Sequence, residues 1–96
     1  MLNYHISRSL PDAFLVPADL RLVAVSDLAI VESLLTGEPE PIVKHTKPIR
    51  TSNPSLGDRK NMAFMTTSVV KGNGRGIVVK IGERTQAGKI SSSINS

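Results

Sequence analysis

The apolar residues of this chain fall into short runs of strand-forming residues, interrupted by proline, glycine and polar residues. Residues 20–25 and 28–35 form two such runs, separated by a Ser-Asp pair, and residues 62–65 begin a further run that residues 67–71 continue. Aliphatic and β-branched residues in runs of this length favour strands, and the residues between the runs favour turns. The pattern therefore predicts a mainly β domain built from short strands, with residues 42–43 as a further two-residue strand.

The length of the chain, 96 residues, allows one small domain. A folded chain of this size buries only about 60–65% of the surface that its unfolded form exposes. Tyr4, Phe14 and Phe64 are its only aromatic residues, so we expect a core of Val, Ile, Leu and Met. The chain has no cysteine, which excludes disulfide bonds, thiolate metal sites and cysteine catalysis.

The two ends of the chain differ from its middle. Residues 1–16 show no clear period, and their Ser, Pro, Asn and Asp content predicts an irregular segment. Thr85 can cap a short closing helix that runs through Ile90. Residues 91–96 are rich in serine, which predicts a solvated tail or linker.

Gly72, Gly74 and Gly76 form a G-x-G-x-G pattern that resembles a nucleotide-binding loop. A phosphate-binding loop must lead into a helix, whose first amides hold the anion. Here the glycines lead into Ile-Val-Val, which favours a strand, and Asn-Gly is a strong hairpin signal. We therefore expect a hairpin turn at residues 72–74 between strands at 67–71 and 76–81, and no small-molecule ligand.

Charge is unevenly distributed along the chain. Residues 1–40 carry a net charge of −4 and residues 41–96 a net charge of +8. The basic residues are scattered, and no aromatic platform for stacking bases lies among them, so we expect no nucleic-acid partner. His5 and His45 are far apart in sequence and lack the nearby ligands of a zinc site, so we expect no metal.

The tripeptide Thr36-Gly37-Glu38 follows an apolar run and is followed by Pro39 and Pro41. Glycine allows a tight bend, and the prolines prevent the chain from continuing as a helix or central strand. This arrangement predicts a carboxylate, that of Glu38, presented at the tip of a stiff loop. A lone carboxylate is not an active site, so any chemistry would act on a group supplied by another segment.

This stretch resembles the Thr-Gly-Glu signature of the actuator domain of P-type cation-transporting ATPases. The Leu-Leu-Thr-Gly-Glu and Gly-Asp-Arg elements are most similar to calcium pumps and fungal sodium-type pumps. Val31 replaces an aspartate that is usual in the family, and Pro39 a serine found in many members. The matching segments are Pro-Ala-Asp-Leu-Arg-Leu at 17–22, Glu-Ser-Leu-Leu-Thr-Gly-Glu at 32–38, Pro-Ile-Val-Lys at 41–44, Gly-Asp-Arg at 57–59, Asn-Met-Ala-Phe at 61–64, Val-Val-Lys-Gly at 69–72, Gly-Ile-Val at 76–78, Gly82, Thr85 and Gly-Lys-Ile at 88–90.

The resemblance implies a partial, distorted jelly-roll or β-barrel actuator domain with a short C-terminal helix. It implies three parts: an unmatched segment at 1–16, the partial actuator domain at 17–90 and a tail at 91–96. No apolar run approaches the roughly 20 residues of a membrane span. We expect the chain by itself to be soluble and, in an intact pump, to lie on the cytoplasmic face of a membrane.

The resemblance also implies a function. Glu38 would position the water that hydrolyses an aspartyl phosphate, while Thr36 and Gly37 would shape the loop. The chain alone would hold no cofactor or metal and would be inactive, because ATP and Mg²⁺ belong to the complete pump. Its partners would be the phosphorylation domain and the transmembrane helices of that pump. The alternative function is that of a stand-alone, small basic β-domain that binds another protein.

Overall fold

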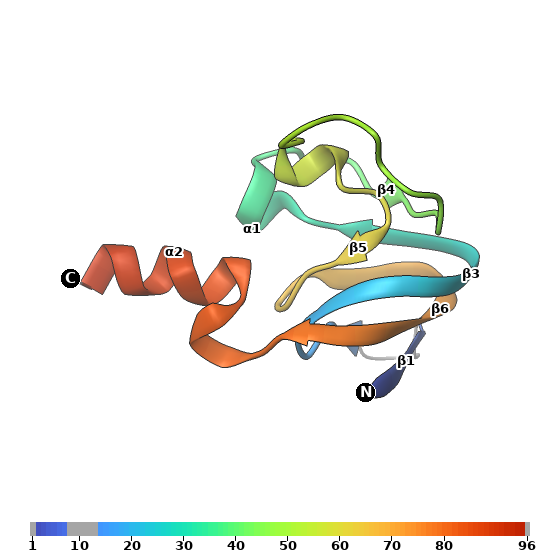
Figure 1. Ribbon diagram of the computed structural model, residues 1–96, viewed down its shortest axis with the longest axis horizontal. Coiled ribbons are helices and arrows are strands. Elements are labelled where there is room, and N and C mark those ends of the chain that lie inside the picture. Colours follow the sequence, from blue (N-terminus) through green and yellow to red (C-terminus); the bar gives the residue numbers. More distant parts are fainter. Residues whose placement is uncertain (1, 8–13, 96) are drawn as a thin grey trace.

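The computed structural model describes residues 2–7 and 14–95. Two long strands, β3 (Asp19–Val31) and β6 (Ser68–Lys80), are its largest elements (Figure 1). Two helices lie outside the sheet: the single turn α1 (Ser33–Thr36) and the closing helix α2 (Gln86–Asn95). The remaining elements are β1 (Asn3–Ser7), β2 (Phe14–Leu15), β4 (Ile42–Val43), β5 (Met62–Ala63) and the 3₁₀ turns η1 (Leu56–Asp58) and η2 (Gly82–Arg84).

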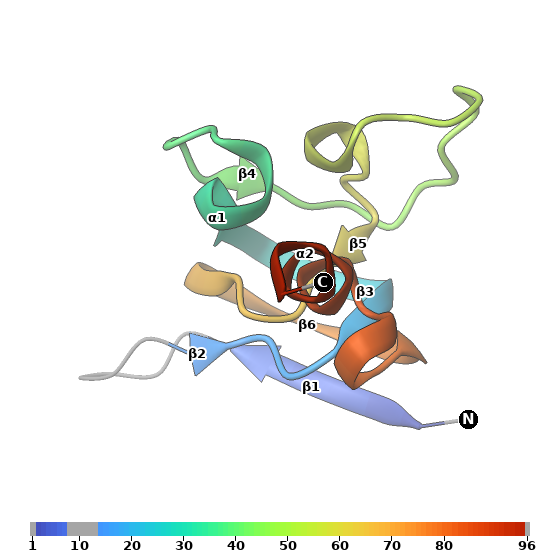
Figure 2. The same ribbon diagram turned by 90° about the vertical axis from the view of Figure 1, so that its left-hand side faces the viewer.

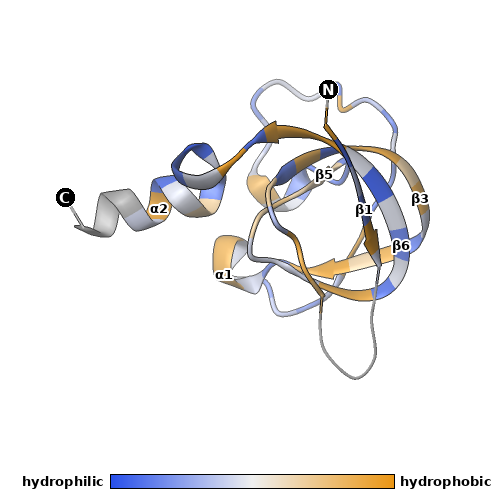
Figure 3. Ribbon diagram, turned by 90° about the horizontal axis from the view of Figure 1, so that it is seen from below, coloured by the Kyte–Doolittle hydropathy of each residue, from blue (hydrophilic) through white to orange (hydrophobic). Residues whose placement is uncertain are grey.

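The six strands form one antiparallel sheet, in which the main path has the order β1-β6-β3-β4. Strand β2 adds to β6 and strand β5 adds to β3, so each long strand has several partners. The long strands bend around a common interior when the molecule is viewed from below (Figure 3). The expected mainly β fold with a short C-terminal helix is therefore confirmed.

The bending of β3 and β6 is explained by irregular pairing. Their register shifts at four points, one of which lies between Ser26 and Ala29. Such bulges increase the local twist and bend a strand. Asp27, within this bulge, adopts a positive φ of 48°. The expectation that the Ser-Asp pair separates two strands is wrong, because the pair lies at this bulge within β3, which continues to Val31.

The glycine pattern on β6 has a structural role that differs from the expected hairpin turn. Gly72 has a φ of 71°, and a Cβ there would lie 2.3 Å from the carbonyl oxygens of Ser26 and Asp27. A Cβ at Gly76 would lie 2.8 Å from the Cβ of Leu20. The predicted hairpin is wrong: β6 continues through Gly72-Asn73-Gly74, and glycine is needed where β6 passes close to β3.

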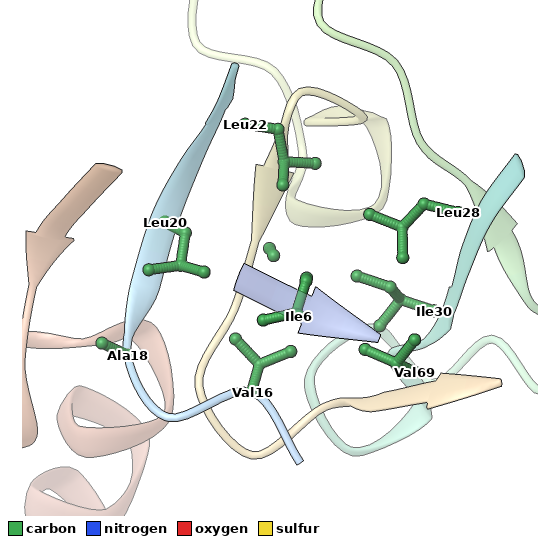
Figure 4. Packing of buried hydrophobic residues seen from close by; sticks show 9 residues of the cluster. Ile6, Val16, Ala18, Leu20, Leu22, Leu28, Ile30 and Val69 are labelled. Carbon is green, nitrogen blue, oxygen red and sulfur yellow. The ribbon is translucent and has the colours of Figure 1, made fainter. Parts of the chain in front are cut away.

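The core lies inside the bent sheet. Its side chains are aliphatic and converge from β1, β3, β6 and the segments beside them (Figure 4). Phe64 is also fully buried, whereas the described methionines are not part of this cluster. The expected aliphatic core is thus confirmed except for its methionines; the cluster consists of Ile6, Val16, Ala18, Leu20, Leu22, Leu28, Ile30, Ala63 and Val69.

The N-terminal segment is more regular than the sequence predicts. Strand β1 pairs with the middle of β6, from Asn3 opposite Ile77 to Ser7 opposite Asn73. Ile6 is buried in the core through this pairing. The expectation of an irregular segment is wrong for residues 3–7 and 14–15, while residues 8–13 lie outside the described part of the chain.

The closing helix begins as predicted and ends later. The Thr85 hydroxyl oxygen accepts a hydrogen bond from the Gly88 amide at 3.0 Å, which is an N-cap. Glycine is needed at position 88 of the helix, because a Cβ there would lie 2.3 Å from the Gly82 carbonyl oxygen. Residues 91–95 continue α2, so the helix extends five residues beyond the predicted end at Ile90. Ser96 lies outside the described residues.

Candidate functional site

The Thr-Gly-Glu segment lies at the end of α1, directly after β3 (Figure 2). The apolar run at 28–35 therefore does not remain a strand to its end: β3 stops at Val31 and one helical turn follows. Gly37 ends that turn in the left-handed conformation, with a φ of 77°. Only glycine adopts this conformation without steric cost, so Gly37 sets the direction in which Glu38 leaves the turn.

Thr36 fixes the turn on both sides. Its hydroxyl donates a hydrogen bond to the Glu32 carbonyl at 3.0 Å and accepts one from the Glu38 amide at 3.2 Å. The Thr36 and Leu35 amides also donate to the Glu32 carbonyl. The backbone on either side of Gly37 is thereby held, while the Glu38 side chain is exposed.

A groove of about 570 Å³ runs between this turn and η1. Its walls include Thr36, Glu38 and Glu40 on one side and Ser55 and Asp58 on the other. The Ser55 hydroxyl donates to the Asp58 carboxylate at 2.9 Å, whereas the Glu38 carboxylate has no hydrogen-bond or ion-pair partner within residues 2–7 and 14–95. Glu38 is thus presented beside an open, acidic groove, as its place before two prolines predicts.

A buried ion pair lies behind the turn. The Lys44 ammonium donates to Glu32 Oε2 at 2.7 Å, and both side chains are fully buried. The Lys44 nitrogen also lies 5.7 Å from the centre of the Phe64 ring, within range of a cation–π contact. The other Glu32 oxygen, Oε1, is buried without a hydrogen-bond partner among the described residues.

Burial perturbs both members of this pair. It raises the pKa of the Glu32 carboxyl and lowers the pKa of the Lys44 ammonium. In each case the charge and the hydrogen bond of the partner oppose the shift. Each charge is therefore maintained in the interior chiefly by the other.

The chain's sequence gives only a weak signal for this pair and for a second buried carboxylate, Asp19. Asp19 Oδ1 accepts the Met65 amide at 2.8 Å, and Oδ2 accepts the Gln86 amide at 2.9 Å. The signal that the sequence offers is the position of these charged residues directly beside apolar runs; they are Asp19, Glu32 and Lys44. Their burial becomes visible only when segments distant in sequence meet.

Neither histidine belongs to a cluster of possible metal ligands within the residues that the structure describes. His5 is an exposed residue of β1, and His45 Nδ1 accepts the Lys47 amide at 3.2 Å. Across the described residues, no three His, Cys, Asp or Glu side chains are close enough together to hold a metal ion. None of the helices in these residues is long and apolar enough to cross a membrane.

A bent β-domain that presents a Thr-Gly-Glu turn beside η1 matches a known family. The family described as the P-type ATPase actuator domain matches residues 11–95, and the chain belongs to this family. The match begins six residues before the point at which the quoted motifs start. The division of the chain at residues 17 and 90 stays a prediction.

Individual relatives include transporters of more than one ion. The calcium-transporting ATPase of Bacillus subtilis is 47% identical over 81 residues, which are 84% of this chain and 9% of that protein. Calcium-transporting ATPase 1 of Schizosaccharomyces pombe is 52% identical over 75 residues, covering 78% of this chain and 8% of that protein. The sodium/potassium exporting P-type ATPase 1 of Saccharomyces cerevisiae is 42% identical over 81 residues, covering 82% of this chain and 7% of that protein.

The chain thus spans less than a tenth of the length of these relatives. The matches agree with the expected similarity to calcium and fungal sodium pumps. They give no support to the alternative of a stand-alone binding module.

Proposed function

We propose that this chain acts as the actuator part of an ATP-driven cation pump and promotes the hydrolysis of an aspartyl phosphate. Membership of the actuator family and the similarity to calcium- and sodium-transporting ATPases support this proposal. The observation that carries it is the geometry of Glu38, an exposed carboxylate with no ion-pair partner in the described part of the chain, on a backbone fixed by Thr36 and Gly37.

In this function, Glu38 orients a water molecule toward the phosphorus and accepts its proton. The oxygen of the water forms the new bond to phosphorus, and the bond from phosphorus to the aspartyl oxygen breaks. Positioning supplies much of the catalysis in phosphoryl transfer, and a placed general base contributes about 10²–10⁴-fold. Gly37 itself has no side chain, and nothing lies within 4 Å of the place where its Cβ would be, so the space beside this residue is open.

The phosphorylated aspartate, ATP and Mg²⁺ belong in this proposal to other domains of the complete pump. The partners of the chain are then the phosphorylation domain and the transmembrane helices, and it works on the cytoplasmic face of the membrane. The groove between α1 and η1 is the surface on which the phosphorylation domain would meet Glu38. By itself the chain has no phosphate to act on and is inactive.

The test is a Glu38→Gln variant in a complete pump whose actuator segment is replaced by residues 14–91 of this chain. The calcium-transporting ATPase of Bacillus subtilis is a suitable host, since it is 47% identical. We expect the phosphoenzyme to form from ATP and then to decay at least about 100-fold more slowly than in the unmodified chimera.

Glu40→Gln is the matched control, because Glu40 is exposed and lines the same groove two residues away. This variant makes the same change in charge and should leave the decay rate within about twofold. Normal decay in Glu38→Gln, or an equal delay in both variants, would contradict the proposed function.

A further inference from the structure

Glu32 and Lys44 stand at the two ends of the segment that carries the Thr-Gly-Glu turn. Glu32 follows the last residue of β3, and Lys44 follows the last residue of β4. Their 2.7 Å ion pair therefore joins the chain entering the segment to the chain leaving it. The Lys44 amide adds a backbone hydrogen bond to the Leu28 carbonyl at 2.9 Å, so the base of the loop is closed twice.

A continuous series of bonds runs from this base to Glu38. Lys44 holds the side chain of Glu32, and the carbonyl of Glu32 holds the amide and the hydroxyl of Thr36. The same hydroxyl accepts the Glu38 amide. A displacement of Glu32 would accordingly be transmitted to the backbone that carries Glu38.

Stability alone is a poor reason for this pair. Replacing a buried ion pair with apolar residues of similar volume is often neutral or stabilising, by about 1–4 kcal/mol. Here the pair carries an additional penalty, because Glu32 Oε1 is buried without a partner among the described residues. What an apolar pair could not provide is a directional bond that fixes where Glu32 lies.

We propose that Glu32 and Lys44 are positioning residues that set the orientation of the Thr36-Gly37-Glu38 turn. The inference rests on the proposed function of Glu38 in phosphoenzyme hydrolysis. Glu32 and Lys44 act through the backbone and touch neither water nor phosphate. The Phe64 ring lies beside the Lys44 ammonium, 5.7 Å from the nitrogen to the ring centre.

The test separates positioning from stability with a double variant, Glu32→Met with Lys44→Met, in the chimeric pump described above. Either single replacement leaves one buried charge unpaired and should lower the thermal stability. The double variant removes both charges, so its stability should return to the level of the parent. Its phosphoenzyme should still form normally from ATP but decay about 10–100-fold more slowly, because Glu38 is misplaced.

Lys44→Arg serves as the conservative variant, since it keeps the charge beside Glu32. Its decay rate should lie closer to that of the parent than to that of the double variant. A double variant that is stable and decays at the parental rate would overturn the proposal and leave the pair a purely structural role. Glu38→Gln, measured in parallel, reports separately on the proposed function: if its decay is normal, the function fails whatever the pair does.

A second measurement needs no catalysis and is made on the 96-residue chain itself. In the double variant, the Thr36 and Glu38 amides should exchange with solvent about tenfold faster, while amides of β3 and β6 keep their protection. Unchanged exchange at Thr36 and Glu38 in a folded double variant would also overturn the proposal. This comparison decides the question if the chimeric double variant fails to accumulate.

Discussion

Replacing Gly72 with alanine should destabilise the chain far more than the same replacement at Gly82. Both glycines have positive φ, 71° at Gly72 and 53° at Gly82, so both variants incur the left-handed penalty of roughly 1–2 kcal/mol. The surroundings differ. A Cβ at Gly82 would meet nothing within 4 Å, whereas a Cβ at Gly72 would lie 2.3 Å from two backbone oxygens of the β3 bulge.

Backbone atoms cannot move aside as a side chain can, so Gly72→Ala must force β6 and β3 apart. Overpacking of this kind typically costs about 1–3 kcal/mol in addition to the conformational penalty. The total is about 2–5 kcal/mol for Gly72→Ala, against about 1–2 kcal/mol for Gly82→Ala. For a domain of this size, the difference corresponds to a Tm lower by roughly 5–20 °C.

Urea unfolding followed by circular dichroism measures both variants, with thermal melts as a second probe. The comparison requires that both variants retain the β spectrum of the parent. Equal costs for the two replacements would refute the reasoning, because they would mean that β6 does not pass the bulge as closely as the structure places it. The G-x-G-x-G pattern would then need another explanation.

Asp19→Ala should lower the free energy of unfolding by about 2–4 kcal/mol in urea titrations, because two backbone amides lose their acceptor. Thr85→Ala should cost about 1 kcal/mol through the lost N-cap and reduce the helical signal of α2 in NMR shifts. Burial raises the pKa of the Glu32 carboxyl above its ordinary 4.5, so folding takes up a proton between pH 4.5 and that raised value. As the pH falls through this window, the parent chain should gain stability over Glu32→Gln, by at most about 1.4 kcal/mol per pH unit.

The controls for these three predictions follow from the same contacts. Asp19→Asn keeps one acceptor oxygen and should cost less than Asp19→Ala; equal costs would contradict the stabilising role of these two hydrogen bonds. Thr85→Ser retains the hydroxyl and loses only the methyl group of this buried residue, so it should cost less than Thr85→Ala, and a loss equal to that of alanine would argue against the cap. If the parent instead loses stability relative to Glu32→Gln as the pH falls through the window, the pKa of this carboxyl is not raised by burial and the prediction is contradicted.

Much of the fold could be predicted from local signals. The strand character of residues 20–25, the two-residue strand at 42–43 and the cap at Thr85 each depend on neighbouring residues, and the structure confirms all three. The exposure of Glu38 follows from Gly37 before it and Pro39 after it, which are also local. Signals of this kind are available in a single sequence.

The errors have one physical cause, which is pairing between distant segments. Asn73-Gly74 favours a hairpin by local propensity, but β1 and β3 occupy the two sides of β6 and keep it extended. Strand β1 has little strand pattern of its own and depends on that pairing. The buried state of Glu32 is likewise fixed by Lys44, twelve residues further along the chain. Tertiary context of this kind overrides local preference.

The position of β6 in the sheet has a consequence for how the chain acquires its structure. Strands β1 and β2 both pair with β6, and β3 makes its longest pairing with it, although β6 begins only at Ser68. Contacts so distant in sequence form slowly, because the loop between them must close first. During synthesis, the residues of β1 must wait until their partners on β6, residues 73–77, have left the ribosome. Until then Ile6, Val16 and Ile30 lack the surface that buries them, and the nascent chain is at its most prone to aggregate.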